Sequence, residues 1–373
     1  MNQADNPQSG IRKKSRVVVA MSGGVDSSAA AALLVGQGYN VIGLMMRLWS
    51  EPSAGSAQRL NRCCTPDQMA DARRVARHLD IPFYVVDVQE HFYTSVVRYF
   101  VDEHVAGRTP NPCIECNRQV RFGQLLDRAL AMGADYLATG HYARVGRLES
   151  EYTLLRARDA AKDQSYVLHV LGQRELTRVM FPVGDYTKSE AREFARQAGL
   201  PVAEKSESMD LCFLADGDYR RFLRDTAGVA IIPGPVTDQS GEVVGQHSGL
   251  ANYTIGQRKG LGLALGRPVY VVAKDVNRNA LVIGDAEQLA RSSLQVTSAN
   301  WISGTPPAVP ISAQVMIRHR AMAVPAIVTA VSHNTAEVHF ERPVTSVSAG
   351  QGAVVYDGDR CLGGGIICDE GEE

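Results

Sequence analysis

The feature that most constrains the fold of this chain is a short apolar segment that leads directly into a loop rich in serine and glycine. Residues 17–21 are apolar, residues 22–28 read Ser-Gly-Gly-Val-Asp-Ser-Ser, and an alanine-rich stretch follows. Glycine permits backbone paths that bulkier residues resist, and the amides of such a loop and of the helix start behind it bind anions. The pattern predicts a strand, a phosphate-binding loop and a helix, in that order.

The side chains of this loop suit the polyphosphate of a nucleotide. Ser22, Ser27 and Ser28 supply hydroxyl donors. Asp26 is an unusual neighbour for phosphate unless it binds Mg²⁺, which indicates a metal-bridged pyrophosphate leaving group. No Gly-Lys-Ser or Gly-Lys-Thr follows, so the loop is not of the Walker type. We therefore expect ATP and Mg²⁺ as cofactors, although a Gly-Gly pair alone would also suit a simple turn.

Strand-like and helix-like segments alternate up to about residue 215. This alternation predicts βαβ units and a doubly wound parallel sheet, which is an α/β fold. A further helix is expected over 188–198, with Thr187 as its cap and Glu190 three residues on. Strands are expected at 16–21, 41–48, 83–88 and 136–139, and helices at 27–37, 66–79, 91–106 and 122–132.

The composition changes after Asp218, where glycine and proline become frequent and the strand-like segments shorten. Segments 269–274 and 280–284 read as a hairpin. Short strands near 312–318, 326–331, 336–340 and 353–356 suggest a small closed β-barrel. We predict a disordered tail at 1–15, a nucleotide-binding catalytic domain at 16–217, a small central domain at 218–290 and a C-terminal β-barrel domain at 291–373.

The composition is that of a soluble globular protein, with 45% hydrophobic and 21% charged residues. No apolar run approaches the roughly 18 residues that span a bilayer, and the polar, basic start is unlike a signal peptide. Seven cysteines, an odd number unevenly spread, suit reactive or metal-binding thiols in a reducing compartment. We expect a cytoplasmic protein with no membrane association, and nothing demands more than a monomer.

The net charge of −1 gives no global attraction to nucleic acid, so RNA binding would have to come from local basic patches. Each patch, taken singly, also suits an ordinary solvated surface. The candidates are Arg73/Arg74/Arg77, Arg118/Arg121, Arg220/Arg221/Arg224, Arg258/Lys259 and Arg318/Arg320.

Two separated cysteines have the surroundings of reactive thiols. Cys116 lies near the end of a proline-bracketed loop expected over 109–117, close to the start of the helix that follows and with Arg118 and Arg121 nearby, which favours a lowered thiol pKa. Cys212 follows in a separate segment, where a buried structural role is the simpler reading. A packed cysteine pair or a zinc half-site would also fit Cys113 and Cys116. Structural roles are the expectation for Cys63, Cys64, Cys361 and Cys368.

Taken together, these motifs resemble those of the bacterial tRNA-specific 2-thiouridylases, a family within the PP-loop superfamily of ATP-cleaving enzymes. The resemblance extends from Val17 to Ile367 and is not confined to one motif. It is carried by an ordered series at residues 20–27, 109–112, 116–117, 139–144, 162–166, 181–184, 212–213, 254–262 and 361–367.

The resemblance implies a PP-loop nucleotide-binding domain, a central domain that contacts tRNA and a C-terminal β-barrel. It implies ATP contacts at Ala20, Met21, Ser22, Gly23, Gly24, Val25, Asp26, Ser27, Met46 and Gly140. It also implies that Asn111, Pro112 and Cys113 face the target base. Further tRNA contacts would be His141, Lys162, Asp163, Gln164, Arg318, His319 and Gln351.

The activity that the resemblance implies is ATP-dependent 2-thiolation of the wobble uridine of tRNA. The C2 oxygen would be adenylated with release of pyrophosphate. Sulfur would come from a persulfide on Cys212, charged by a sulfur-relay protein or a cysteine desulfurase. Cys116 would then release the sulfur by forming a disulfide with Cys212.

One position departs from the family pattern, because many members carry aspartate where Cys113 stands. The change creates a Cys-x-x-Cys pair with Cys116. Together with Cys212, this pair could supply three ligands to a 4Fe–4S cluster and leave one iron open for a sulfide. The sequence leaves both the persulfide and the cluster route open.

Two other classes of function share the ATP loop. A PP-loop ligase would amidate a small molecule, but we find no glutaminase-like domain and the cysteine set would be idle. An ATP-gated RNA-binding module would need no chemistry, yet Asp26, Cys116 and Cys212 are all present.

Overall fold

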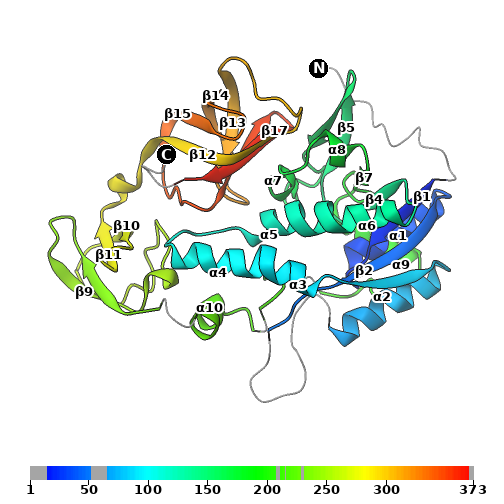
Figure 1. Ribbon diagram of the computed structural model, residues 1–373, viewed down its shortest axis with the longest axis horizontal. Coiled ribbons are helices and arrows are strands. Elements are labelled where there is room, and N and C mark those ends of the chain that lie inside the picture. The colour runs from blue at the N-terminus through cyan, green and yellow to red at the C-terminus, as the bar shows by residue number, and fades with distance from the viewer. Residues whose placement is uncertain (1–14, 52–64, 207–210, 215, 228–230, 369–373) are drawn as a thin grey trace.

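The computed structural model describes residues 15–51, 65–206, 211–214, 216–227 and 231–368. Figure 1 shows three lobes: a parallel sheet with helices, a β-barrel and a smaller β-sheet beside them. Our predictions for the tail and for Cys63 and Cys64 lie outside the described residues. None of the helices in these ranges combines the length and the apolar character needed to cross a membrane.

The parallel sheet contains the four predicted strands and a fifth, β7, that the sequence analysis did not predict, in the order β3-β2-β1-β4-β7. Every neighbouring pair is parallel, and β1 is central, with Val18 opposite both Ile42 and Leu137. The chain turns to opposite sides of β1 to form β2 and β4, so ligands are expected at the carboxyl end of β1. The strands are β1 (Arg16–Ala20), β2 (Asn40–Arg47), β3 (Phe83–Asp87), β4 (Tyr136–Ala138) and β7 (Val179–Met180).

The helices around this sheet begin where the sequence places their caps. Thr65 and Thr187 each accept a hydrogen bond from the backbone of the third helical residue, and the Gln68 and Glu190 side chains return the contact. The predicted helix starts at these two positions are confirmed. The elements are α1 (Val25–Gly36), α2 (Pro66–His78), α7 (Ser165–Leu168), α8 (Gln173–Leu176), α9 (Lys188–Gln197) and α10 (Tyr219–Ala227).

Two longer helices each contain a π-helical stretch. The first consists of α3 (Gln89–Phe92), η2 (Tyr93–Val97) and α4 (Arg98–Val105). The second consists of α5 (Pro112–Glu115), η3 (Cys116–Leu125) and α6 (Leu126–Ala131). The second begins ten residues before the predicted start at 122, so the prediction of a loop through residue 117 was wrong. Asn111 caps this helix and Pro112 takes its first position, where proline is favourable.

The C-terminal strands form a closed six-stranded antiparallel barrel around an apolar core. Pairing of β12 with β17 closes it. The hairpin of β5 (Arg144–Leu148) and β6 (Glu151–Leu155), which the sequence analysis did not predict, adds to the outer side of β17. The barrel strands are β12 (Arg291–Trp301), β13 (Ile311–Met316), β14 (Val324–Ala330), β15 (Ala336–Val344), β16 (Gly352–Asp357) and β17 (Arg360–Ile367).

A four-stranded sheet of order β10-β11-β8-β9 lies between these two parts of the chain in sequence. The predicted hairpin is present as the antiparallel pair β10–β11. The elements are β8 (Gly234–Thr237), β9 (Val243–His247), η4 (Leu250–Asn252), β10 (Tyr270–Asp275), β11 (Ala280–Gly284) and η5 (Ala286–Leu289).

Three buried histidines make the fold sensitive to acid. Burial lowers the pKa of His104 to about 3 and that of His169 to about 4. Burial, and then the charge of Arg121, holds the pKa of His141 well below its ordinary value. All three are therefore neutral in the folded chain, whereas in the unfolded chain each takes up a proton below about pH 6.5.

We expect the chain to be most stable above pH 6.5 and to lose stability as the pH falls from 6.5 towards the folded pKa values. Each histidine contributes a slope of about 1.4 kcal/mol per pH unit in that window. The three together predict a loss of about 4 kcal/mol between pH 7 and pH 5.5. Urea unfolding at a series of pH values measures this loss, and a flat profile over that range would contradict it.

Candidate active site

The phosphate loop joins β1 to α1 at the carboxyl end of the central strand, as predicted. The hydroxyl of Ser27 accepts a hydrogen bond from the Ser22 amide at 3.1 Å and lies 3.3 Å from the Ser22 hydroxyl. Ser28 donates to the Gly24 carbonyl at 2.8 Å. Gly24 is the N-cap of α1, so the loop leads directly into a helix amino terminus. This is the arrangement that favours a bound anion.

Gly23 is the position in this loop that other residues fit least. Its φ is +73°, and a Cβ atom there would lie 2.3 Å from the carbonyl oxygen of Gln68. The amino end of α2 therefore packs directly on the loop backbone. Gly140, which follows β4, lies against the backbone of Asp26 and Ser27 on the other side.

Asp26 forms an ion pair that the sequence analysis missed. Lys188 Nζ donates to both carboxylate oxygens, at 2.7 and 2.8 Å, and the Tyr142 hydroxyl donates to one of them at 2.8 Å. Lys188 is the first residue of α9, where the helix dipole disfavours a cation. A lysine at the first position of a predicted helix was the sequence signal that could have identified Lys188 as a partner of a distant carboxylate.

A second lysine also reaches the loop from a distant part of the chain. Lys205 Nζ donates to the Gly23 carbonyl at 3.1 Å and to the Asp71 carboxylate at 2.6 Å. Burial raises the pKa of Asp71, but hydrogen bonds from Lys205 and Arg74 outweigh it and hold that pKa below its ordinary value. No local pattern identified Lys205, because its partners are far away in sequence.

The remaining predicted ATP contacts surround this loop. Met21 and Val25 are buried, and Ala20 is partly buried at the end of β1. Met46, near the end of β2, is partly buried and packs against two apolar clusters. Their contacts with a nucleotide stay predictions.

Cys116 and Cys212 belong to one apolar cluster. Cys116 is 4% exposed at the start of η3, and the partly buried Cys212 packs against the same group of side chains. The cluster includes Leu48 and Val88, which directly follow β2 and β3. It therefore lies at the carboxyl edge of the parallel sheet, the edge that also carries the phosphate loop.

Cys113 differs from these two thiols in being exposed, and its amide is capped by Asn111 at 3.1 Å. Within the described residues, no group of three His, Cys, Asp or Glu side chains is placed to hold one metal ion.

The arginines expected to lower the Cys116 pKa have partners of their own. Arg118 pairs with Glu115 at 2.5 Å. Arg121 donates to Asn117 Oδ1 and to His141 Nε2, both at 3.2 Å. Since arginine only donates, Nε2 of His141 accepts, and Nδ1–H donates to the Thr139 hydroxyl at 2.7 Å.

His141 is thus a buried, neutral imidazole that joins the helix of Cys116 to the end of β4. Phe122 and Phe181 flank its ring, with centroids at 5.8 and 6.0 Å. Contact of His141 with tRNA stays a prediction, and it would require the buried ring to become accessible.

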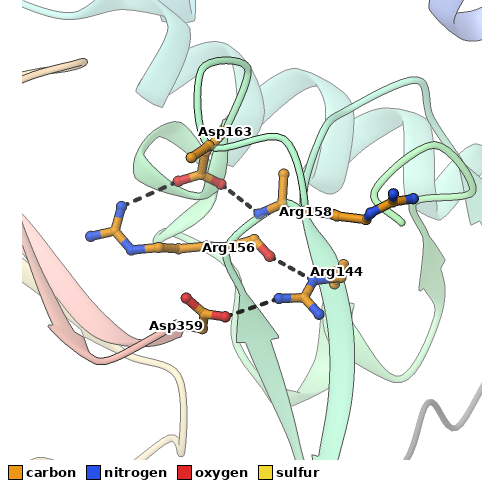
Figure 2. Close-up of a pocket in the computed structure, with 7 residues that line it drawn as sticks. Arg144, Arg156, Arg158, Asp163 and Asp359 are labelled. Atoms are coloured by element: carbon orange, nitrogen blue, oxygen red, sulfur yellow. Dashed lines mark hydrogen bonds and ion pairs between the residues drawn. The ribbon is translucent and has the colours of Figure 1, made fainter. Parts of the chain in front are cut away.

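Residues 162–164 fold beside a cavity of about 310 Å³ that arginines and aspartates line (Figure 2). The Asp163 carboxylate accepts from the backbone amides of Ala157 at 2.9 Å and Ser165 at 3.2 Å, and it pairs with Arg156. Gln164 Oε1 accepts from the Tyr142 amide at 2.9 Å. Asp163 and Gln164 therefore shape this segment, and the predicted tRNA contacts of both residues and of Lys162 stay untested.

The structure brings this segment next to a second stretch that was assigned to tRNA. The ring of His319 lies 5.7 Å from that of Tyr166, and Asp163 is among the groups that influence the His319 pKa. Arg318 and His319 are exposed after β13. The sequence separation hid this proximity, which depends on docking of the barrel.

Gln351 contacts the loop that presents Asn111, Pro112 and Cys113. Its side-chain amide donates to the Thr109 carbonyl at 2.6 Å, and the Thr109 amide donates to the Ala349 carbonyl at 2.8 Å. We name residues 345–351 the barrel loop. Through these two hydrogen bonds the barrel loop holds Thr109, which lies two positions before Asn111.

We expect Gln351→Leu to lower kcat by about fivefold, because loss of one neutral hydrogen bond of about 1 kcal/mol loosens the segment that presents Asn111 and Pro112. Affinity for tRNA should change by less than about twofold in the same variant. Steady-state kinetics with tRNA as the varied substrate separates the two effects. Weaker tRNA binding with unchanged kcat would instead mark Gln351 as a direct tRNA contact, as the resemblance implies.

A central parallel strand that ends in this serine–glycine loop, with basic side chains converging on it, defines a nucleotide-binding protein of the PP-loop class. The family models match in the same order. They are the tRNA methyl transferase HUP domain over 15–216, the tRNA methyl transferase PRC-barrel domain over 220–285 and the aminomethyltransferase beta-barrel domain over 291–367.

Relatives match over almost the whole chain. The tRNA-specific 2-thiouridylase MnmA of Chloroflexus aggregans is 51% identical over 352 residues, which cover 94% of this chain and 98% of that protein. MnmA of Geobacter metallireducens is 47% identical, covering 95% and 97%. The solved U34-tRNA thiolase NcsA from Methanococcus maripaludis with its 4Fe-4S cluster is 20% identical, covers 57% of this chain and 63% of that one, and has a TM-score of 0.34.

The chain therefore belongs to the family of tRNA-specific 2-thiouridylases, and it is a sulfurtransferase of this family. The expected family and the expected fold, with an α/β part, a central part and a C-terminal barrel, are confirmed.

Proposed function

We propose that this chain catalyses ATP-dependent 2-thiolation of the wobble uridine of tRNA in the cytoplasm, acting as a monomer. The observation that carries the proposal is the placement of Cys116 and Cys212 in one cluster at the sheet edge that bears the phosphate loop. Adenylation acts on the C2 oxygen and sulfur delivery on the C2 carbon, so both groups have to reach the same carbonyl of one target base. The activity in the names of the relatives agrees with this reading.

The first step activates the base. The flipped uridine presents its C2 oxygen, which attacks the α-phosphate of ATP, and pyrophosphate leaves. The serine hydroxyls and the amides of residues 22–28 would hold the phosphates. Lys188 and Lys205 would offset the charge of Asp26 and Asp71, the carboxylates with which they pair beside this loop. Mg²⁺, when bound at Asp26, would neutralise charge on the pyrophosphate, and the Lys188 ammonium would then have to yield that carboxylate.

The second step delivers sulfur. A sulfur-relay protein or a cysteine desulfurase would transfer a sulfur atom to Cys212, giving a persulfide. The terminal persulfide sulfur attacks C2, and AMP leaves with the former carbonyl oxygen. The Cys116 thiolate then attacks Cys212 Sγ, so that a Cys116–Cys212 disulfide forms and the base keeps the outer sulfur. A dithiol reductant returns both cysteines to the starting state.

The cluster alternative fits the arrangement of the side chains less well. Cys113 is exposed, whereas Cys116 is buried in an apolar cluster against which Cys212 packs. We therefore propose the persulfide route and assign Cys113 no step in it.

The test is ATP-dependent incorporation of ³⁵S into unmodified tRNA, with AMP and pyrophosphate measured in parallel. One AMP and one pyrophosphate per labelled 2-thiouridine is the expected result. Turnover of ATP without labelled RNA would favour a small-molecule ligase, and binding of tRNA without any turnover would favour a regulatory module.

A further inference from the structure

We propose that Arg258 and Lys259 form a binding site for the backbone phosphates of the RNA substrate. They lie in residues 254–262, which we name the basic loop and to which the reaction described above assigns no role. The inference rests on the proposed function only in naming tRNA as the ligand.

The basic loop has a fixed shape around these two cations. Gln257 joins its two sides, since Oε1 accepts from the Thr254 amide at 3.1 Å and Nε2 donates to the Lys259 carbonyl at 3.0 Å. The backbone of residues 256 and 257 pairs with Val271 of β10 through bonds of 2.8 and 3.0 Å. Leu261, on the far side, is buried in the core of the central sheet. The loop is therefore ordered before any ligand arrives, so binding orders little further backbone.

Arg258 and Lys259 are exposed, and the described part of the chain shows no ion pair for either side chain. This distinguishes them from the arginines of the cavity in Figure 2, where Arg144 pairs with Asp359 and Arg156 with Asp163. Arginines neutralised in this way have less charge to offer a phosphate. Since the net charge of the chain is −1, RNA affinity depends on cations that keep their charge available.

The position of the basic loop connects it to the cysteines. Gly256 has a φ of +84°, and a Cβ atom there would lie 2.4 Å from the Ser346 hydroxyl oxygen, so the basic loop packs directly on the barrel loop. The barrel loop in turn holds Thr109, four residues before Cys113. β10 is tied to the same region, because Lys274 donates to the Gly107 carbonyl at 2.9 Å. Figure 1 shows β10 and β11 beside the end of α4, below the barrel.

The path from Cys113 to Arg258 runs through these contacts between loops and crosses few residues. Each residue adds at most about 3.6 Å, so Arg258 lies within about 40 Å of Cys113. An RNA helix carries a phosphate at every nucleotide, so its charged backbone runs along its whole length. A uridine presented to Cys113 can therefore bring the backbone of its own helical arm to the basic loop. Phosphate contacts of this kind position the substrate without reading its sequence.

The experiment measures binding of an unmodified tRNA transcript to the full chain across a salt series from about 50 to about 300 mM. We expect R258Q/K259Q to reduce the slope of log K against log salt by about 1.5 to 2, and to weaken binding about tenfold or more near 100 mM salt. The value of kcat at saturating tRNA should stay unchanged. The charge-preserving variant R258K/K259R should keep the wild-type slope.

The matched control is R128Q/R178Q, which removes two exposed cations from the other edge of the parallel sheet. Arg178 directly precedes β7, and Arg128 lies in the last turns of α6, which leads back to the start of β4. This control should bind tRNA with the wild-type slope. Thermal unfolding of all variants checks that the fold is intact.

An unchanged slope and affinity in R258Q/K259Q would overturn the site. So would a lower kcat at saturating tRNA in a folded variant, because the cations would then act on the chemistry. If the wild-type chain binds tRNA with the expected slope but incorporates no sulfur, the proposed function fails and the phosphate site remains.

Discussion

Replacing Gly23 with alanine is expected to abolish ATP-dependent pyrophosphate release while leaving tRNA affinity within about twofold of wild type. The backbone at Gly23 has a φ of +73°, which costs an L-residue about 1–2 kcal/mol. The added Cβ would also meet the Gln68 carbonyl oxygen at 2.3 Å. That oxygen is part of the backbone of α2 and cannot rotate away like a side chain. The phosphate loop or the helix must therefore move.

Such a movement affects several loop contacts at once, because the Gly23 carbonyl is also the acceptor for Lys205. A shift of about 1 Å in groups that position a reacting phosphate can cost about a hundredfold in rate, and here several such groups shift together. Pyrophosphate release measures turnover, and calorimetric titration with ATP measures binding.

The matched control is Gly36→Ala at the end of α1, where an added Cβ has nothing within 4 Å. This variant should keep wild-type turnover and gain stability of up to about 1 kcal/mol. A Gly23→Ala protein that is folded and cleaves ATP at the wild-type rate would show that the loop does not bind the phosphates.

The fold was predictable where the evidence is local. The alternation of strand-like and helix-like segments predicted the parallel sheet, and the capping residues Thr65 and Thr187 predicted the starts of α2 and α9. The helix at Pro112 was missed because proline serves both loops and first helical turns, and only the Asn111 cap decides between them. The β5–β6 hairpin was missed because its partner strand β17 lies some two hundred residues further on.

The residues of the candidate site likewise form two groups: those that a local motif identifies and those that only tertiary packing brings to the site. Ser22, Ser27 and the glycines stand in one short segment, and their chemistry can be read directly. Lys188 and Lys205 reach that segment only through tertiary packing. Asp163, assigned to tRNA by resemblance, accepts hydrogen bonds from neighbouring amides, and its contact with tRNA stays a prediction. A motif shows that a residue matters, whereas the fold decides whether its side chain faces the ligand.

Replacing Cys212 with serine is expected to lower tRNA thiolation by about 10⁴-fold or more, because the atom that carries the sulfur is lost. Cys116→Ser should be nearly as severe, since the sulfur would stay bound to Cys212. Both variants should still release pyrophosphate once per tRNA, because neither thiol takes part in adenylation. Cys368→Ser, a partly buried thiol of the barrel end, should retain wild-type activity and serves as the control.

Cys113→Ala separates the two sulfur routes. In the persulfide route Cys113 holds no sulfur, so the variant should keep activity within about threefold of wild type, and oxygen-free protein should contain no stoichiometric iron. In the cluster route Cys113 is one of three ligands, so the variant should lose both iron and activity. The exposure of Cys113 beside the buried Cys116 leads us to expect the first outcome. Thiolation that survives in both Cys116→Ser and Cys212→Ser would contradict either route, because each requires these two thiols.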